Sequence, residues 1–186
     1  MFIQTEATPN PQTLKFLPGR DVLPGEPRDF RDAESARVSP LATALFTIEG
    51  VTGVFLGSDF IAVTKDATDW AHLKPSILGA VMDHYLSNTP ILNDGPSTLA
   101  PAGDIFFDAK DAEMVEVIKE LLETRIRPAV AMDGGDITLK GYRDGMVYLH
   151  MQGACSGCPS STATLKNGIE NLLRHFVPGV EGVAEI

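Results

Sequence analysis

The stretch LHMQGACSGCP (residues 149–159) forms the centre around which the rest of the chain can be interpreted. It begins with alternating apolar and polar side chains, as a strand does, and it ends at Pro159, a residue that suits the first position of a helix. Between them lies a glycine-rich loop with Cys155 and Cys158, the only cysteines among 186 residues. The sequence thus predicts a strand, a cysteine loop and a helix in direct succession.

This strand, cysteine loop and helix belong to a C-terminal domain that we predict over residues 111–186. Asp111 is a predicted N-cap, and an apolar stripe at helical spacing comes after it. Asp133 and Asp136 flank two glycines and are expected to serve a turn and its cap. In chain order the predicted elements are a helix that ends at Pro128, strands at 137–142 and 146–151, a helix from Pro159 and a strand at 180–186. The order is α-β-β-α-β.

The first half of the chain predicts a second domain, over residues 1–88, and a Pro/Gly-containing linker over 89–110. Its predicted elements are strands at 2–6 and 13–17, a loop over 18–38, a helix opening at Ser39-Pro40, a hairpin of 51–56 and 60–64, and a helix through Tyr85 that Pro75 interrupts. The fold class is therefore α+β, with two small α+β domains.

Composition restricts the partners and the location. The net charge is −10 and the pI about 4.7, which disfavours nucleic acid because phosphate binding depends on Lys and Arg. No run approaches the ~20 apolar residues of a membrane span. Residues 1–17 resemble neither a secretory signal nor an organelle transit peptide. We therefore expect a bacterial-type cytoplasmic protein in a reducing compartment, where a close cysteine pair more often binds a metal or reacts.

The number of cysteines limits what the loop can hold. Zinc and iron–sulfur clusters usually take four protein ligands, so an all-cysteine site requires a second copy of this chain. Gly153 and Gly157 allow a sharp turn, and the start of the next helix supplies positive potential to Cys158. Four interpretations are open: a cluster bridging two chains, a zinc-bridged structural dimer, a thiol–disulfide oxidoreductase, or simple packing.

The sequence segments around the cysteines favour one of these interpretations. MDGGDI (132–137), LHMQGACSGCPSS (149–161) and TLKNGIE (164–170) closely resemble the C-terminal domain of NifU-like (Nfu-type) iron–sulfur scaffold and carrier proteins. TEATPNPQTLKF (5–16) resembles the N-terminal domain that accompanies it. The resemblance implies a labile 4Fe–4S cluster held by Cys155 and Cys158 of a homodimer. It also implies transfer to apo iron–sulfur client proteins, contact with the cluster-assembly machinery, and no enzymatic activity.

Other chemically active residues have plainer interpretations. His150 lies five residues before Cys155, but strand alternation makes it a surface or core-edge histidine rather than a ligand. Trp70, the only tryptophan, is expected in a core. The sequence contains no phosphate-binding glycine loop with its lysine, no dinucleotide fingerprint and no nucleophile–histidine–acid set that we can assemble. These observations also favour a protein that is not an enzyme.

Overall fold

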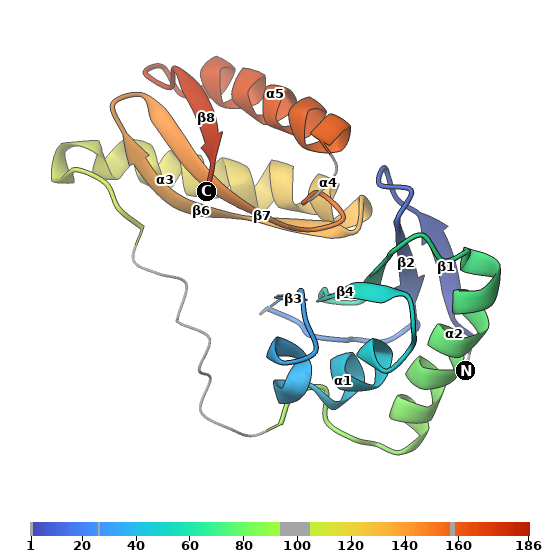
Figure 1. The fold of residues 1–186 in the computed structure, drawn as a ribbon. Helices are drawn as coiled ribbons and strands as arrows, with labels where there is room; N and C mark the ends of the chain where they lie inside the picture. The colour runs from blue at the N-terminus through green and yellow to red at the C-terminus, as the bar shows by residue number, and fades with distance from the viewer. Residues whose placement is uncertain (1, 26, 94–104, 157–158) are drawn as a thin grey trace. The chain divides into compact units, whose positions relative to one another are not determined.

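The computed structural model describes residues 2–25, 27–93, 105–156 and 159–186. The chain divides into two compact units, Met1–Pro96 and Ser97–Ile186. Each unit combines helices with a sheet of its own (Figure 1), which confirms the predicted α+β class with two domains. In the part of the chain that is described, no helix has both the length and the apolar character needed to cross a membrane.

Unit 1 is built on a five-stranded antiparallel sheet of order β1-β2-β5-β4-β3. Its strands are β1 (Gln4–Ala7), β2 (Thr13–Leu17), β3 (Arg28–Phe30), β4 (Val51–Leu56) and β5 (Ile61–Lys65), and its helices are η1 (Ser35–Val38), α1 (Pro40–Phe46) and α2 (Trp70–Leu86). Apolar side chains of α1 and α2 pack with those of the strands in one core, which includes Phe16, Leu41 and Ile77. The Ser39 hydroxyl accepts a hydrogen bond from the Ala42 N–H at 3.1 Å, so Ser39 is the cap that the sequence predicted.

Two details of unit 1 differ from the prediction. The expected loop over 18–38 contains the edge strand β3 and the short helix η1. Pro75 does not interrupt α2, which runs through it. Proline leaves the carbonyl of residue 71 without its helical donor, but Ala71 and Pro75 are both exposed, so water can reach this carbonyl. A proline on the solvent side therefore does not end the helix.

Unit 2 has a three-stranded sheet of order β6-β7-β8. Its elements are η2 (Ala109–Asp111), α3 (Ala112–Leu121), η3 (Leu122–Ile126), α4 (Arg127–Met132), β6 (Gly135–Arg143), β7 (Met146–Gly153), α5 (Pro159–Phe176) and β8 (Gly182–Glu185). β6 and β7 form the predicted hairpin across Asp144 and Gly145, whose φ angles of 50° and 80° belong to a tight two-residue turn. β8 pairs in parallel with β7, so α5 is the crossover between them.

The core of unit 2 lies between its sheet and its helices. Buried side chains of α3, η3, α4 and α5 pack against one face of β6 and β7; they include Val115, Ile118, Val130, Ile169 and Leu173 on the helices and Ile137, Leu149 and Met151 on the strands. The predicted order α-β-β-α-β is confirmed if α3, η3 and α4 are counted as one interrupted helix.

The interruption contradicts the prediction that the helix ends at Pro128. The chain widens into the π-helical segment η3, where the Arg127 N–H donates to the Leu122 carbonyl five residues back, and α4 then continues to Met132. Pro128 lies in the first turn of α4, where its missing N–H removes little hydrogen bonding. The π-helical turn thus lets the helix restart at a proline instead of ending there.

Residues just before η2 pack onto the sheet edge beside β6. The Phe106 N–H donates to the Lys140 carbonyl at 3.1 Å, and the Phe106 carbonyl accepts from the Tyr142 N–H at 2.8 Å. The Phe106 ring occupies the space left by the missing side chain of Gly141 and lies 5.1 Å from the Tyr148 ring. Residues 94–104 of the predicted linker lie outside the described residues, but its last part is packed against unit 2.

Candidate functional site

Cys155 lies in the loop between β7 and α5, at the corner that the sequence analysis singled out. Gly153 has a φ of 71°, which turns the chain away from the sheet. The Ala154 N–H then donates to the Gly134 carbonyl at 3.1 Å, and the Ser156 N–H donates to the Gly153 carbonyl at the same distance. These bonds place Cys155 against the start of β6, where it is only 5% exposed and belongs to the core of unit 2.

Gly135 forms the floor beneath Cys155. A Cβ atom at this position would lie 2.8 Å from the Cys155 Sγ and 2.6 Å from the Gln152 carbonyl oxygen, both closer than real Cβ contacts. Gly135 pairs with Gly153 in the β6–β7 ladder, so the two glycines stand opposite each other below the loop. Because Gly135 has no side chain, the Cys155 sulfur can occupy the space next to it.

The first turn of α5 holds the other side of the loop. The Thr162 hydroxyl donates to the Cys155 carbonyl at 2.8 Å, and the Ser156 hydroxyl donates to the Gly153 carbonyl at 3.1 Å. The first bond gives the Cys155 carbonyl a side-chain partner, and the second adds to the hydrogen bond that the Gly153 carbonyl already accepts from the Ser156 N–H. The backbone at Cys155 is thus fixed by β6 on one side and by α5 on the other.

The surroundings of Cys155 favour the neutral thiol. Burial raises its pKa to about 12, and the negative charges of Asp133 and Asp136 act in the same direction. The stabilisation of a thiolate by the helix terminus was predicted for Cys158, which lies outside the described residues together with Gly157. The Cys155 thiol therefore keeps its proton at neutral pH until something replaces it.

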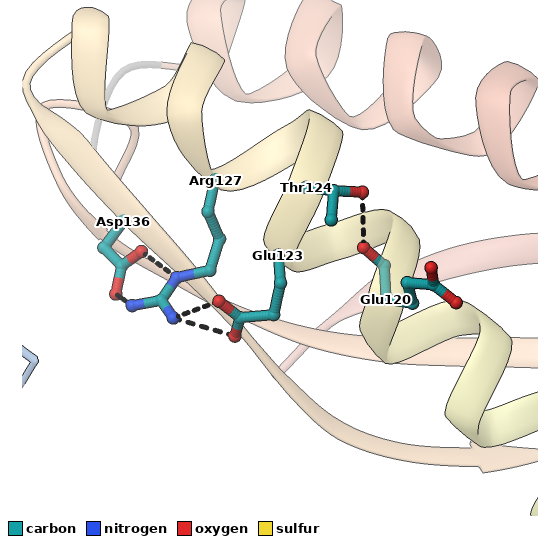
Figure 2. Close-up of polar contacts among 5 residues, drawn as sticks. All are labelled: Glu120, Glu123, Thr124, Arg127 and Asp136. Carbon is teal, nitrogen blue, oxygen red and sulfur yellow. Dashed lines mark hydrogen bonds and ion pairs between the residues drawn. The ribbon is translucent and has the colours of Figure 1, made fainter.

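Asp136 does not serve the turn-and-cap role that the sequence predicted for it. It is a residue of β6, only 5% exposed, and Figure 2 shows its carboxylate facing the guanidinium of Arg127. Arg127 Nε donates to Asp136 Oδ1 at 2.8 Å and Nη2 donates to Oδ2 at 3.0 Å. A buried carboxylate needs such a partner, which explains why Asp136 tolerates a strand position. Asp133 does lie in the expected turn, at the end of α4.

His150 lies where the sequence placed it, whereas Trp70, expected in a core, is only partly buried at the edge of one. His150 alternates with the buried residues Leu149 and Met151, and its Nδ1 is 2.7 Å from the Ile186 oxygen. Trp70 packs against the core of unit 1, and its Nε1 donates to the Pro11 carbonyl at 3.2 Å. Within residues 2–25, 27–93, 105–156 and 159–186, no three His, Cys, Asp or Glu side chains gather as a metal site. The ligand pair Cys155 and Cys158 remains a prediction.

Sequence reasoning missed two contributors to the site. Gly135 is part of the MDGGDI segment, but its contact with the Cys155 sulfur, 20 residues further along the chain, depends on the pairing of β6 with β7. Arg127 lies just before Pro128, where the sequence predicted the end of a helix, and nothing in the sequence marked it as part of the site. Its pairing with Asp136 depends on the π-helical turn before it, for which the one local signal is Pro128.

Comparison with known families accounts for most of the chain. Residues 3–88 match the model described as the N-terminal domain of the scaffold protein Nfu/NifU, and residues 118–184 match that of the NifU-like domain. The Drosophila sechellia protein named NFU1 iron-sulfur cluster scaffold homolog, mitochondrial, is 50% identical over 188 residues. The human protein of the same name is also 50% identical, and the alignment covers all of this chain and 72% of the human one. The chain therefore belongs to the Nfu/NifU-like family of scaffold proteins.

This chain spans 65% of the length of the Drosophila sechellia relative. A solution NMR structure of a NifU-like protein from Saccharomyces cerevisiae has a TM-score of 0.47 and 25% identity, and it covers 51% of this chain and 87% of its own.

The predicted bacterial-type cytoplasmic location is wrong, because the Drosophila and human relatives are both named as mitochondrial proteins. That prediction rested on the first 17 residues of this chain. The relatives are longer than this chain, so residues 1–17 do not determine its subcellular location.

Proposed function

We propose that this chain is an iron–sulfur cluster scaffold and carrier. Cys155 and Cys158 of two copies hold a labile 4Fe–4S cluster as cargo, and the dimer passes it to apo iron–sulfur client proteins. The cluster-assembly machinery is the other partner of the dimer. The observation that carries the proposal is the position of Cys155. It is a soft sulfur donor at a glycine-lined corner, in a chain whose relatives are named iron–sulfur cluster scaffolds.

The raised pKa of Cys155 has a consequence for release. Iron binds the thiolate, so the Cys155 Sγ gives up its proton when the cluster loads. When a client thiolate replaces Cys155 on iron, the freed sulfur takes a proton back at neutral pH. The protonated thiol competes poorly for the same iron, which favours transfer over rebinding. A buried cysteine thus suits a carrier that must give up its cargo.

The same feature weakens one of the alternatives. A thiol–disulfide oxidoreductase attacks through a thiolate, and its nucleophilic cysteine usually has a pKa well below the ordinary value. Burial moves the pKa of Cys155 the other way, to about 12. A zinc-bridged dimer would use the same four sulfurs, so metal and sulfide content must separate it from a cluster-bridged one.

Anaerobic reconstitution with iron and sulfide tests the proposal. A four-iron cluster shared by two chains gives about two irons and two acid-labile sulfides per chain, with a brown visible absorbance. Mass measured under native conditions should report a dimer in the loaded form and a shift toward monomer after chelation, because cluster and assembly are linked. A tightly held single metal per dimer without sulfide would show a zinc-type site and contradict the proposal.

A further inference from the structure

The guanidinium of Arg127 lies between two carboxylates that come from different elements (Figure 2). On one side it donates to both oxygens of Asp136 in β6, at 2.8 and 3.0 Å. On the other side its Nη1 donates to both oxygens of Glu123 in η3, each at 2.8 Å. The planar fork of arginine fits such two-point contacts, and lysine cannot reproduce them. The helix and the first residues of β6 are therefore joined through one side chain.

The two carboxylates differ in depth. The Asp136 side chain is 7% exposed, whereas that of Glu123 is 61% exposed. An exposed pair four residues apart on a helix contributes little, while removing one partner of a buried pair leaves an uncompensated charge. The pKa of Arg127 is raised above its ordinary value, with the hydrogen bonds to Asp136 as the largest cause. The contact that matters structurally is therefore Arg127 to Asp136.

Asp136 is directly connected to the floor of the cysteine loop. It comes directly after Gly135, above which the Cys155 sulfur lies, and it pairs with Gln152 in the β6–β7 ladder. The Gly134 carbonyl accepts the hydrogen bond that fixes Ala154. A shift of Asp136 would move Gly135 with it and change the depth of the Cys155 sulfur. The fork thus binds the residue next to Gly135, the part of the loop's surroundings that has no side chain of its own.

The π-helical turn η3 sets the position of Arg127 on the helix. In η3 the Thr124 hydroxyl donates to the Glu120 carbonyl at 2.7 Å, and the Arg127 N–H donates to the Leu122 carbonyl. A π-helical turn inserts one residue into the helical repeat and so rotates the next helical segment about the axis. Arg127 is the first residue after this turn, and its side chain reaches β6. An irregular helix and a buried carboxylate therefore meet at one residue beside the loop.

We propose that Arg127 is a positioning residue of the cysteine site. Its fork holds Asp136, and through it Gly135, at the depth at which the Cys155 sulfur meets iron. This inference rests on the proposed function for the meaning of the site, but the placement of Cys155 can be measured without any cluster.

The first arm of the test uses the apo protein in a Cys158→Ser background, so that Cys155 is the only thiol. Alkylation by iodoacetamide is timed for Arg127→Gln, Glu123→Gln and the matched control Arg174→Gln. Arg174 pairs with Glu170 at 3.1 Å on the exposed side of α5 and has no contact with β6 through this pair. Loss of the fork should speed alkylation at least about tenfold through local opening, and the other two variants should stay within about twofold. Equal rates for Arg127→Gln and the control would overturn the proposal.

The second arm uses the reconstituted protein with both cysteines. The visible circular dichroism of a cluster reports the geometry of its sulfur ligands, which general destabilisation of the fold would leave unchanged in the folded fraction. Arg127→Gln should alter this spectrum and release iron to a chelator faster, while Glu123→Gln and Arg174→Gln should match the parent. A parental spectrum and release rate in Arg127→Gln would overturn the proposal. If the parent itself takes up no cluster, the proposed function fails, and the alkylation arm still decides the role of Arg127.

Arg127→Lys covers the case in which Arg127→Gln does not fold. Lysine keeps the positive charge near Asp136 but loses the two-point fork, so far-ultraviolet circular dichroism should remain that of the parent. The proposal requires faster alkylation and an altered cluster spectrum in this variant too. A lysine variant identical to the parent in both would show that charge alone is needed and would overturn a role for the fork.

Discussion

The two units share the order helix, hairpin, helix, and they differ most at the corner where the hairpin leads into the second helix. In unit 1 this corner is the loop 66–69, and its side chains close it. The Asp66 carboxylate accepts hydrogen bonds from the Thr68 N–H and hydroxyl at 2.8 and 2.6 Å, and Asp69 caps α2 by accepting from the Ala71 N–H. The bonds from Thr68 lower the pKa of Asp66. All the polar groups named here are used to close the turn.

The corresponding corner of unit 2 is closed in another way. There the hydrogen bonds run from backbone to backbone, at Ala154 and Ser156, or from hydroxyls to backbone carbonyls, as at Thr162. The Cys155 side chain is left to pack on Gly135. The comparison shows that a loop between a hairpin and a helix can be closed by its own side chains, as in unit 1, or mainly through backbone groups, as at the candidate site of unit 2.

The largest expected effect is the removal of a cysteine. Cys155→Ser or Cys158→Ser should each abolish stable loading of a cluster, because each deletes two of the four proposed ligands from a dimer. The apo fold should survive, with a cost of about 1–3 kcal/mol for placing a hydroxyl at the buried position 155. His150→Ala serves as the control, since its ring bonds to the Ile186 oxygen. A histidine variant that loses iron as completely as a cysteine variant would replace the all-cysteine model.

A methyl group at the floor of the loop should have the next largest effect. Gly135→Ala forces a Cβ to within 2.8 Å of the Cys155 sulfur, and overpacking of this kind typically costs about 1–3 kcal/mol. Stability against urea and iron content should both fall. Gly168→Ala in α5 of the same unit is the matched control, because its Cβ meets open space and alanine in a helix stabilises by about 0.5–1 kcal/mol. Similar iron content in the two variants would show that the missing side chain of Gly135 is not needed to position the Cys155 sulfur.

The features that the sequence predicts correctly differ from those that it does not in how local their causes are. Local chemistry predicted the Ser39 cap, the hairpin that β6 and β7 form, and the start of α5 at Pro159, because each depends on neighbouring residues. The predicted interruption of a helix at Pro75 and the predicted helix end at Pro128 were wrong. In the first case solvent satisfies the freed carbonyl, and in the second a π-helical turn absorbs the proline.

The candidate site divides along the same line. Cys155 is evident from composition and spacing alone. The floor at Gly135 and the fork at Arg127 are contacts between elements, so they require the register of β6 against β7 and the rotation of α4 about its axis. A single sequence contains no direct measure of either. Residues that bear chemistry were therefore predictable, and residues that hold them in place were not.

Truncation should separate the two units with a smaller cost. A fragment of residues 105–186 is expected to fold, dimerise and load a cluster alone, while a fragment of residues 1–93 should be folded and colourless. Starting at Lys110 instead removes Phe106, whose ring packs on Gly141 and whose backbone makes two hydrogen bonds with β6. Phe106 is 37% exposed, so its loss should lower the free energy of unfolding by about 1–2 kcal/mol. Thermal unfolding of the two fragments measures this difference, and equal stability would make residues 105–109 dispensable.

The smallest expected effects concern pH, and we consider one buried titratable group of each unit whose pKa is shifted by burial. In unit 1 this is His84 of α2, which is 7% exposed, and its Nε2 has no hydrogen-bond partner among the described residues. Burial lowers its pKa below the ordinary 6.5. In unit 2 it is Cys155, whose pKa is raised from 9.0 to about 12. The two groups therefore shift stability on opposite sides of neutrality.

For His84 the unfolded chain takes up a proton as the pH falls through 6.5, whereas the folded chain does so only at lower pH. The unfolded state then binds more protons, so the stability of unit 1 should fall below pH 6.5, by less than about 1.4 kcal/mol per pH unit. For Cys155 the unfolded thiol ionises above pH 9 while the folded one does not, so unit 2 should lose stability as the pH rises from 9 toward 12.

Urea unfolding at about pH 5.5, 7.5 and 9.5 tests both directions. His84→Leu should remove the acid loss and leave the alkaline one, and Cys155→Ala should do the reverse, with the exposed His72→Gln as the control for acid titration in general. An acid loss that persists in His84→Leu would mean that another group of unit 1 is responsible, and the two units would then differ less in their buried titratable groups than this structure indicates.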